Sequence, residues 1–280
     1  MIKIVADTLS NIPPAEAKEL GVAYLPQVII FGTESYYDDY EINSEIFLKK
    51  LRSSTQLPKT AAPPPELYHP IFEEFSNAGH TIIVIAPSTE LSGTYRSAMV
   101  AARDFPNADI HIIDTRVIGG GLAAIVRQAV SWAEQGLDAE TLVKNIEEMS
   151  ARHRIYFVVD TLEYLHKGGR IGGAKALMGS ILQIKPILSL QNGRIEPIES
   201  QRTHRKAIER LREIIDAECP HGEDSFLCMM HGDALEETSQ LAKGFEADLG
   251  LSNIHIYWLP PAILVHVGPG LIAASFFVAK

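Results

Sequence analysis

A chain of 280 residues can form one large or two medium-sized domains, and it can bury a core without disulfide staples. Its content of 46% hydrophobic and 21% charged residues is that of a globular protein rather than a disordered one. The net charge of -10 argues against a general attraction to nucleic acid or anionic membranes. Two cysteines exclude a disulfide framework and a four-cysteine zinc site.

Short β-branched runs predict five strands, in chain order residues 2–6, 81–86, 110–113, 155–159 and 226–230. Helical periodicity lies between them. Asn43 or Ser44 is the predicted N-cap of a helix over residues 45–51, and Asp138 that of a later helix. The apolar face of that later helix consists of Leu142, Val143, Ile146 and Met149. Apolar strands that alternate with amphipathic helices indicate a parallel sheet covered on both faces.

A hairpin is predicted in the second half of the chain. Residues 186–190 and 195–200 flank an Asn192-Gly193 turn, and this pair tolerates the two positive φ angles of a type I′ turn. Because we expect antiparallel pairing only there, the sequence predicts an α/β fold of two domains. Residues 1–153 would form an N-terminal parallel-sheet α/β/α domain, and residues 154–280 a C-terminal mixed-sheet α/β domain.

Residues 249–279 contain no Asp, Glu, Lys or Arg and are long enough to suggest a membrane span. Pro260-Pro261, His266 and the Gly268-Pro269-Gly270 turn interrupt this stretch. We therefore expect buried strands followed by a final helix, without stable membrane insertion. Residues 1–7 contain a polar residue too early for a signal-peptide core, so we expect a cytoplasmic protein with reduced thiols.

Small polar residues follow the predicted strands: Asp7, Ser88, Asp114, Asp160 and His231. Ligands bind at the carboxyl ends of strands in open α/β sheets, whereas the same residues also serve as caps of the following helices. Both interpretations stay open for these positions.

The sequence contains no complete nucleotide or metal motif. Gly119, Gly121 and Ala124 match G-x-G-x-x-A, but they lie several residues beyond their strand, so we interpret them as a flexible helix start. Residues 168–173 have the glycine spacing of a phosphate loop, yet Ala174-Lys175-Ala176 follows and supplies no hydroxyl for Mg²⁺. We expect no metal, no cofactor and no catalytic residue.

Residues 88–98 follow a predicted strand directly. Ser92 is the expected cap of the next helix, and Gly93 leaves the backbone N–H groups sterically open. A helix start with a hydroxyl and a glycine binds carboxylate or phosphate, although a plain cap without a ligand has the same pattern.

Cations gather in two places of this acidic chain. Residues 165–171 form a predicted basic, flexible loop with Lys167 and Arg170, and Arg202 lies where a further helix opens. Arginine can bind a carboxylate through two parallel hydrogen bonds, but the same basic residues also occur in loops that only contact solvent. His266 is predicted inside an apolar strand, either bonded to core neighbours or donating to a ligand carboxylate.

The motifs together resemble the DegV family of fatty-acid-binding proteins over essentially the whole chain. The matching segments are Asp7-Thr8, Lys59-Thr60-Ala61-Ala62-Pro63, Leu91-Ser92-Gly93-Thr94-Tyr95, Tyr164-Leu165-His166-Lys167-Gly168-Gly169-Arg170-Ile171, Ile184-Lys185-Pro186-Ile187-Leu188 and His266-Val267-Gly268-Pro269-Gly270.

The resemblance implies a two-domain protein that holds one long-chain fatty acid, with its carboxylate between the domains and its tail in a buried tunnel. It also implies a partner, a fatty-acid kinase that converts the bound acid to acyl-phosphate. Ser92 and His266 match the family's head-group residues, with Gly93 beside Ser92, and Arg170 matches its glycine-loop arginine. Thr60 lies in a motif usually read Thr-Ser-Gln-Pro. Here Ala61 lacks the hydroxyl, so Thr60 or backbone N–H groups would supply that contact.

Two further functions remain open from the sequence. The family resembles the substrate-binding part of dihydroxyacetone kinases, so the chain could be a subunit of a small-molecule kinase. A lipid-sensing regulatory protein would have the same motifs. We expect Lys167, Arg170 and Arg202 to contact either the head group or the partner kinase.

Overall fold

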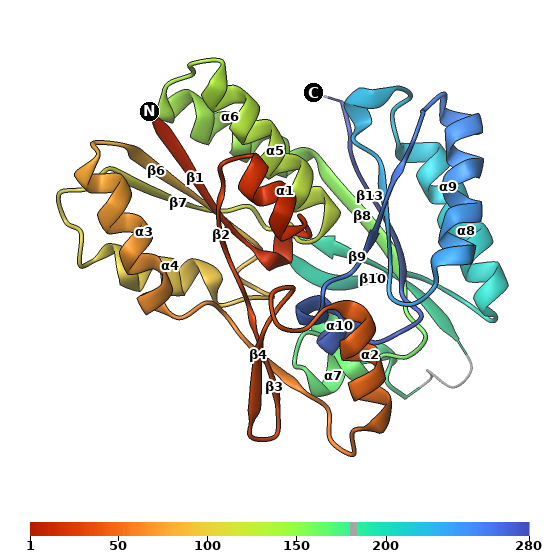
Figure 1. The fold of residues 1–280 in the computed structure, drawn as a ribbon. Helices are drawn as coiled ribbons and strands as arrows, with labels where there is room; N and C mark the ends of the chain where they lie inside the picture. The colour runs from red at the N-terminus through yellow and green to blue at the C-terminus, as the bar shows by residue number, and fades with distance from the viewer. Residues whose placement is uncertain (180–183, 280) are drawn as a thin grey trace. The chain divides into compact units, whose positions relative to one another are not determined.

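The computed structural model describes residues 1–179 and 184–279 and divides the chain into two compact units (Figure 1). Unit 1 consists of Met1–Ala151 and Pro260–Ala262. Unit 2 consists of Arg152–Leu259 and Ile263–Lys280. The expected α/β class with a parallel sheet in one half and a mixed sheet in the other is confirmed.

Unit 1 is built on a parallel four-stranded sheet in the order β2-β1-β6-β7. Its strands are β1 (Ile2–Asp7), β2 (Ala23–Leu25), β6 (Thr81–Ala86) and β7 (Ile110–Asp114). These strands are short runs of β-branched residues, and their side chains alternate between two covered faces. The predicted strands at residues 2–6, 81–86 and 110–113 are thereby confirmed.

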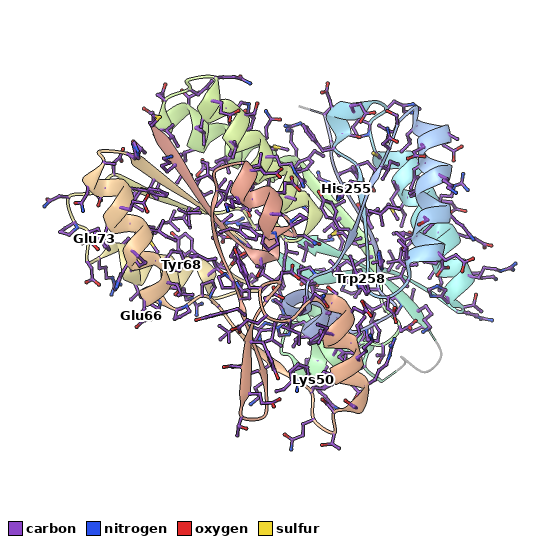
Figure 2. All side chains as sticks on the ribbon, viewed as in Figure 1. Lys50, Glu66, Tyr68, Glu73, His255 and Trp258 are labelled. Carbon is purple, nitrogen blue, oxygen red and sulfur yellow. The ribbon has the colours of Figure 1, made fainter. Side chains whose placement is uncertain are left out.

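Helices cover both faces of this sheet. In chain order, the helices of unit 1 are η1 (Thr8–Ser10), α1 (Pro14–Glu19), α2 (Ser44–Ser53), α3 (Pro65–Asn77), α4 (Thr94–Ala102), α5 (Gly120–Glu134) and α6 (Ala139–Arg152), and of these α2 does not lie on the parallel sheet. Figure 1 shows α3 and α4 on one side of the sheet and α5 and α6 on the other. Figure 2 shows the amphipathic character of α3, because Tyr68 points inward while Glu66 and Glu73 point outward.

Both predicted caps are confirmed. The Asn43 side chain accepts a hydrogen bond of 2.9 Å from the backbone N–H of Ile46, at the start of α2. The Asp138 side chain accepts one of 2.8 Å from Thr141, at the start of α6. Each cap satisfies a backbone donor that has no partner within its helix.

The expectation that antiparallel pairing occurs only in the second half is wrong. Unit 1 contains a second, three-stranded antiparallel sheet of β4 (Glu34–Tyr37), β3 (Val28–Phe31) and β5 (Lys59–Ala61). A two-residue turn joins β3 to β4, and Gly32 has a φ of 60° at its first position. Gly-X at this position is typical of a type II′ hairpin.

Unit 2 is built on a mixed six-stranded sheet in the order β10-β9-β8-β13-β11-β12. Only β11 and β12 pair in parallel. Its elements are β8 (His153–Val158), α7 (Glu163–Lys167), η2 (Gly172–Leu177), β9 (Lys185–Gln191), β10 (Arg194–Gln201), α8 (His204–Glu218), η3 (Glu223–Ser225), β11 (Cys228–His231), α9 (Leu235–Leu249), β12 (His255–Trp258), α10 (Pro261–Val267), whose first two residues belong to unit 1, and β13 (Ile272–Phe277).

One core holds this unit together. Leu211 of α8 and Phe245 of α9 are fully buried against Met229 and Phe276 of the sheet. The predicted hairpin is confirmed as β9 and β10, where Asn192 and Gly193 have φ angles of 51° and 81°. Both angles are positive, as a type I′ turn requires.

The end of the chain reverses the predicted order. His266 lies in helix α10 rather than in a strand, and the last element is strand β13 rather than a helix. Pro261 is the first residue of α10, where its fixed φ favours a helix and its missing N–H costs nothing. Gly268 and Gly270 then turn the chain with positive φ. Among the described residues, no helix is long and apolar enough to cross a membrane.

Candidate functional site

The predicted site residues fall into two groups, one in each unit. Ser92 and Gly93 of unit 1 precede α4, which begins at Thr94. The expectation that Ser92 is the N-cap is wrong, because Gly93 occupies that position without a side-chain cap. Ser92 lies one residue earlier, in a turn closed by the Ser92 N–H on the Ser88 carbonyl at 2.9 Å. Its hydroxyl oxygen still accepts a long bond of 3.3 Å from the Thr94 N–H.

The segment that contains Thr60 runs beside the start of α4. Ser97 of α4 donates through Oγ to the Pro63 carbonyl at 2.5 Å. A Cβ added to Gly93 would lie 3.5 Å from the Cβ of Ala62. The structure therefore places the Thr60-to-Pro63 segment next to Gly93, within unit 1. Thr60 is half-buried, and Ala61 is exposed.

A buried polar network lies behind Ser92, and the sequence did not predict it. The Asp7 carboxylate accepts from Thr94 Oγ1 at 2.5 Å, from Gln27 Nε2 at 2.6 Å and from the Leu9 N–H at 3.0 Å. Gln27 Nε2 also donates to Thr94 Oγ1 at 3.0 Å. Thr94 Oγ1 in turn lies 2.9 Å from Ser92 Oγ. The signals were present, since Asp7 ends a strand and Thr94 is part of the matching motif.

Burial dominates the electrostatics of this network. Desolvation raises the pKa of Asp7 to about 6, although hydrogen bonds from Thr94, Gln27 and Leu9 act in the opposite direction. Burial also raises the pKa of Asp38, which accepts the backbone N–H of Ala262 at 3.1 Å. Desolvation raises the pKa of the neighbouring Asp39 to about 6.

In unit 2, His266 lies against the end of α7. A Cβ added to Gly168 would overlap His266 Nδ1 and lie 2.9 Å from the Tyr164 carbonyl oxygen. A Cβ added to Gly268 would overlap the Tyr164 ring, and one added to Gly270 would overlap the Asp160 carboxylate. Glycine at all three positions lets the turn after α10 pack closely against α7 and the end of β8.

His266 and Arg170 form a second group. Burial, and then the positive charge of Arg170, lower the pKa of His266 to about 3. The imidazole is therefore neutral near pH 7 and carries one N–H. Arg170 Nη1 donates to the Gly168 carbonyl at 2.7 Å, which holds the guanidinium beside the same glycine.

The two other predicted cations lie at the surface. The segment expected to be a flexible loop begins as helix α7, and there Lys167 Nζ pairs with Glu163 Oε1 at 2.5 Å. Buried Leu165 anchors this helix, which explains why the segment is ordered. Arg202 lies in the exposed bend before α8, and no hydrogen bond between described residues joins it to Arg170 or His266.

The predicted flexible glycine segment is the start of a helix. Gly119 has a φ of 69° and donates through its N–H to the Leu9 carbonyl at 2.8 Å, directly before α5. Within residues 1–179 and 184–279, no group of three or more His, Cys, Asp or Glu side chains is placed to hold a metal ion.

These features define a two-unit α/β protein with one parallel and one mixed sheet. The chain belongs to the DegV family, whose model, described as "Uncharacterised protein, DegV family", matches residues 1–279. A DegV domain-containing protein of Halalkalibacterium halodurans is 32% identical over 280 residues, with 100% of this chain and 99% of that protein covered.

Solved structures of two relatives are similar along their whole length. One is entitled "Fatty Acid Binding of a DegV family Protein from Thermus thermophilus", with 27% identity, a TM-score of 0.90 and 99% of each chain covered. The other is described as a stearic acid-binding protein from Eubacterium ventriosum, with 26% identity, a TM-score of 0.86, and 99% of this chain and 98% of that chain covered.

The packing at Gly168 generates a test of how His266 is held. We expect Gly168→Ala to displace the His266 ring, because the added methyl group overlaps Nδ1. Nitrogen-15 spectra of the histidine side chains would show a shifted His266 signal, assigned with His266→Ala. Gly179→Ala is the matched control, since Gly179 has no positive φ and an added Cβ there would have nothing within 4 Å. An unchanged His266 signal in Gly168→Ala would contradict this packing.

Proposed function

We propose that this protein binds one long-chain fatty acid and presents its carboxylate to a partner kinase. The observation that carries the proposal is the full-length similarity to the Thermus thermophilus protein, whose title names fatty acid binding. In the proposed reaction, a carboxylate oxygen of the bound acid attacks the γ-phosphorus of ATP held by the kinase. ADP leaves with the bonding pair, and an acyl-phosphate forms.

Unit 1 would supply hydrogen-bond donors to the carboxylate. The start of α4 carries backbone N–H groups and the positive end of the helix dipole, which favour an anion. Ser92 is half-buried at this start, and exposed Gly93 adds no side chain that would cover it. The Thr60 segment runs alongside, so a Thr60 hydroxyl or a backbone N–H of this segment replaces the contact that Ala61 lacks.

Unit 2 would supply the remaining donor. Neutral His266 donates one ring N–H to the carboxylate. A buried carboxylate is costly unless it is hydrogen-bonded, so loss of a donor weakens binding. The acyl tail supplies the affinity, since burying each methylene contributes about 0.8 kcal/mol.

The chain itself supplies no residue for ATP chemistry in this proposal, because neither glycine segment of its sequence is a complete nucleotide motif. The kinase therefore has to dock. Lys167, Arg170 and Arg202 are the proposed docking residues, since basic side chains on an acidic protein steer a transient contact.

Denaturing mass spectrometry of the purified protein tests the binding proposal directly. We expect a co-purifying fatty acid at about one per chain. Lipid-free protein that fails to take up palmitate and instead binds ATP with Mg²⁺ would contradict the proposal and support a small-molecule kinase subunit.

Ser92→Ala and His266→Ala test the head-group residues. Each removes one hydrogen bond to a charged group, worth about 1.5–3 kcal/mol, so we expect palmitate affinity to fall roughly 10- to 150-fold. The double variant should lose less than the sum, because both residues contact one carboxylate. Displacement of a fluorescent fatty acid measures the affinities, and thermal melts check folding. Unchanged affinity in both single variants would contradict the assignment.

Arg170→Ala separates docking from binding. We expect the variant to keep its fatty acid while acyl-phosphate formation with the cognate kinase and ATP falls at least about tenfold, the loss of about one charge-assisted bond. Arg205→Ala is the matched control, because Arg205 is exposed on α8 and pairs only locally with Glu209 at 3.7 Å. Equal loss of lipid and turnover in Arg170→Ala would place Arg170 in the binding site instead.

A further inference from the structure

Three side-chain oxygens form a line from the interior of unit 1 to Ser92. Asp7 Oδ2 lies 2.5 Å from Thr94 Oγ1, and Thr94 Oγ1 lies 2.9 Å from Ser92 Oγ. Asp7 is 0% exposed and Thr94 2% exposed, so water does not replace these bonds. Gln27 Nε2 donates both to Asp7 Oδ2 and to Thr94 Oγ1. The position of each hydroxyl hydrogen along this line is therefore set by its neighbours.

The ionised form of Asp7 fixes the hydrogens in one direction. A carboxylate only accepts, so the single hydroxyl hydrogen of Thr94 points to Asp7. Thr94 Oγ1 can then only accept, and the 2.9 Å contact requires Ser92 to donate its own hydrogen inward. In this state Ser92 presents lone pairs outward, and these repel a ligand carboxylate.

The protonated form of Asp7 reverses every hydrogen. Asp7 then donates to Thr94 Oγ1, and Thr94 donates to Ser92 Oγ. Ser92 then accepts two bonds, one from the Thr94 hydroxyl and one from the Thr94 N–H at 3.3 Å. Its own hydrogen becomes available to a carboxylate outside. No heavy atom has to move for the change, and each oxygen stays fully bonded.

We propose that Asp7 is a positioning residue that takes up one proton when a fatty-acid carboxylate binds, and so turns the Ser92 hydroxyl outward through Thr94. This inference rests on the proposed function, because it takes Ser92 as a head-group residue. One proton from solvent per ligand forms one O–H bond on the Asp7 carboxyl group, and the hydroxyl hydrogens of Thr94 and Ser92 only rotate.

The surroundings of Asp7 favour this role. Desolvation raises its pKa to about 6, so in the free protein the group is mostly ionised at pH 7. Its pKa is only about one pH unit below 7, so a small rise in this pKa on ligand binding is enough to protonate it. The titratable groups that interact with Asp7 are Tyr24 of β2, Tyr68 of α3 and Asp38. Burial raises the pKa of both phenols, which stay neutral, and burial also raises the pKa of Asp38.

A purely structural role predicts a different outcome. Asp7 also accepts the Leu9 N–H and so caps η1. If capping were its only role, substitution would lower stability, and the pH dependence of ligand affinity would not change. The proton relay instead makes affinity fall about tenfold per pH unit above about pH 6, because the free protein must gain the proton on binding.

The test measures the dissociation constant of palmitate from about pH 6 to about pH 8.5 for five proteins. We expect palmitate affinity to fall with rising pH in the wild type, in Thr94→Ser, which keeps the relay hydroxyl, and in Asp39→Asn. The last is the matched control, since desolvation also raises the Asp39 pKa to about 6, and asparagine tolerates its positive φ of 57°. We expect no slope in Asp7→Asn or in Thr94→Val, where the relay is absent.

Two further measurements locate the proton. Hexadecanesulfonate, whose head group stays ionised throughout, should show the same slope as palmitate if the proton goes to the protein. Calorimetry in buffers of different ionisation enthalpy should show uptake approaching one proton per palmitate near pH 7.5 in the wild type and none in Asp7→Asn. These measurements on the wild type do not depend on the folding of any variant.

The results separate the relay from the proposed function. Palmitate binding without a pH slope in the wild type would overturn the relay and leave the proposed function intact. A slope that persists in Asp7→Asn, or that Asp39→Asn removes, would also overturn it. Absence of palmitate binding at every pH would overturn both.

Discussion

The buried carboxyl group of Asp7 is the constraint on which the packing around the end of β1 and the start of α4 depends. A charge without water is costly unless donors surround it, and here three donors come from three separate segments. Leu9 follows β1, Gln27 precedes β3, and Thr94 is the first residue of α4. Satisfying one carboxyl group therefore fixes the end of the central strand, the entry to the small antiparallel sheet and the start of α4, which follows Ser92.

Unit 2 holds the side chain of His266 by close packing instead of by charge. His266 lies in a short helix whose end turns through Gly268 and Gly270, and both glycines lie against side chains of the segment after β8. Gly168 brings the backbone of α7 against the imidazole itself. The ring is consequently held by steric contact and kept neutral by burial. The spacing of these glycines in the sequence thus reflects packing distances around one histidine, and flexibility is not needed to explain it.

Local sequence signals predicted the parts of the fold that depend on local physics. The strands β1, β6 and β7 are β-branched runs bounded by polar residues, and the Asn192-Gly193 turn has its own backbone preference. The prediction of a strand around His266 was wrong because residues 263–267 are as apolar and as rich in β-branched side chains as a strand. Pro261 at the helix start and the glycines at its end decide that segment, and tertiary packing overrides its β propensity.

The site was predictable as motifs but not as a network. Ser92, Gly93 and His266 stand in recognisable segments. The hydrogen-bond partners of Thr94, to which Ser92 is bonded, come from positions 7 and 27, far away in the sequence. A single sequence does not show which polar strand end is buried, so Asp7 looked like any other cap. Burial is a property of the assembled sheet, and it raises the pKa of the Asp7 carboxyl group above its ordinary value.

The three residues Ser92, Gly93 and Thr94 therefore differ in kind although they are adjacent. Gly93 is exposed and leaves the helix start open, Ser92 is half-buried at the boundary, and Thr94 is buried and bonded to Asp7. Tail burial in a lipid-binding protein is non-directional, so it adds affinity for any apolar chain without distinguishing its ends. Orientation must come from a few hydrogen bonds with fixed direction. In the proposed relay, the protonation state of Asp7 sets the direction of the Ser92 hydrogen from the interior, so the hydroxyl has one defined direction in each state, which a solvated hydroxyl lacks.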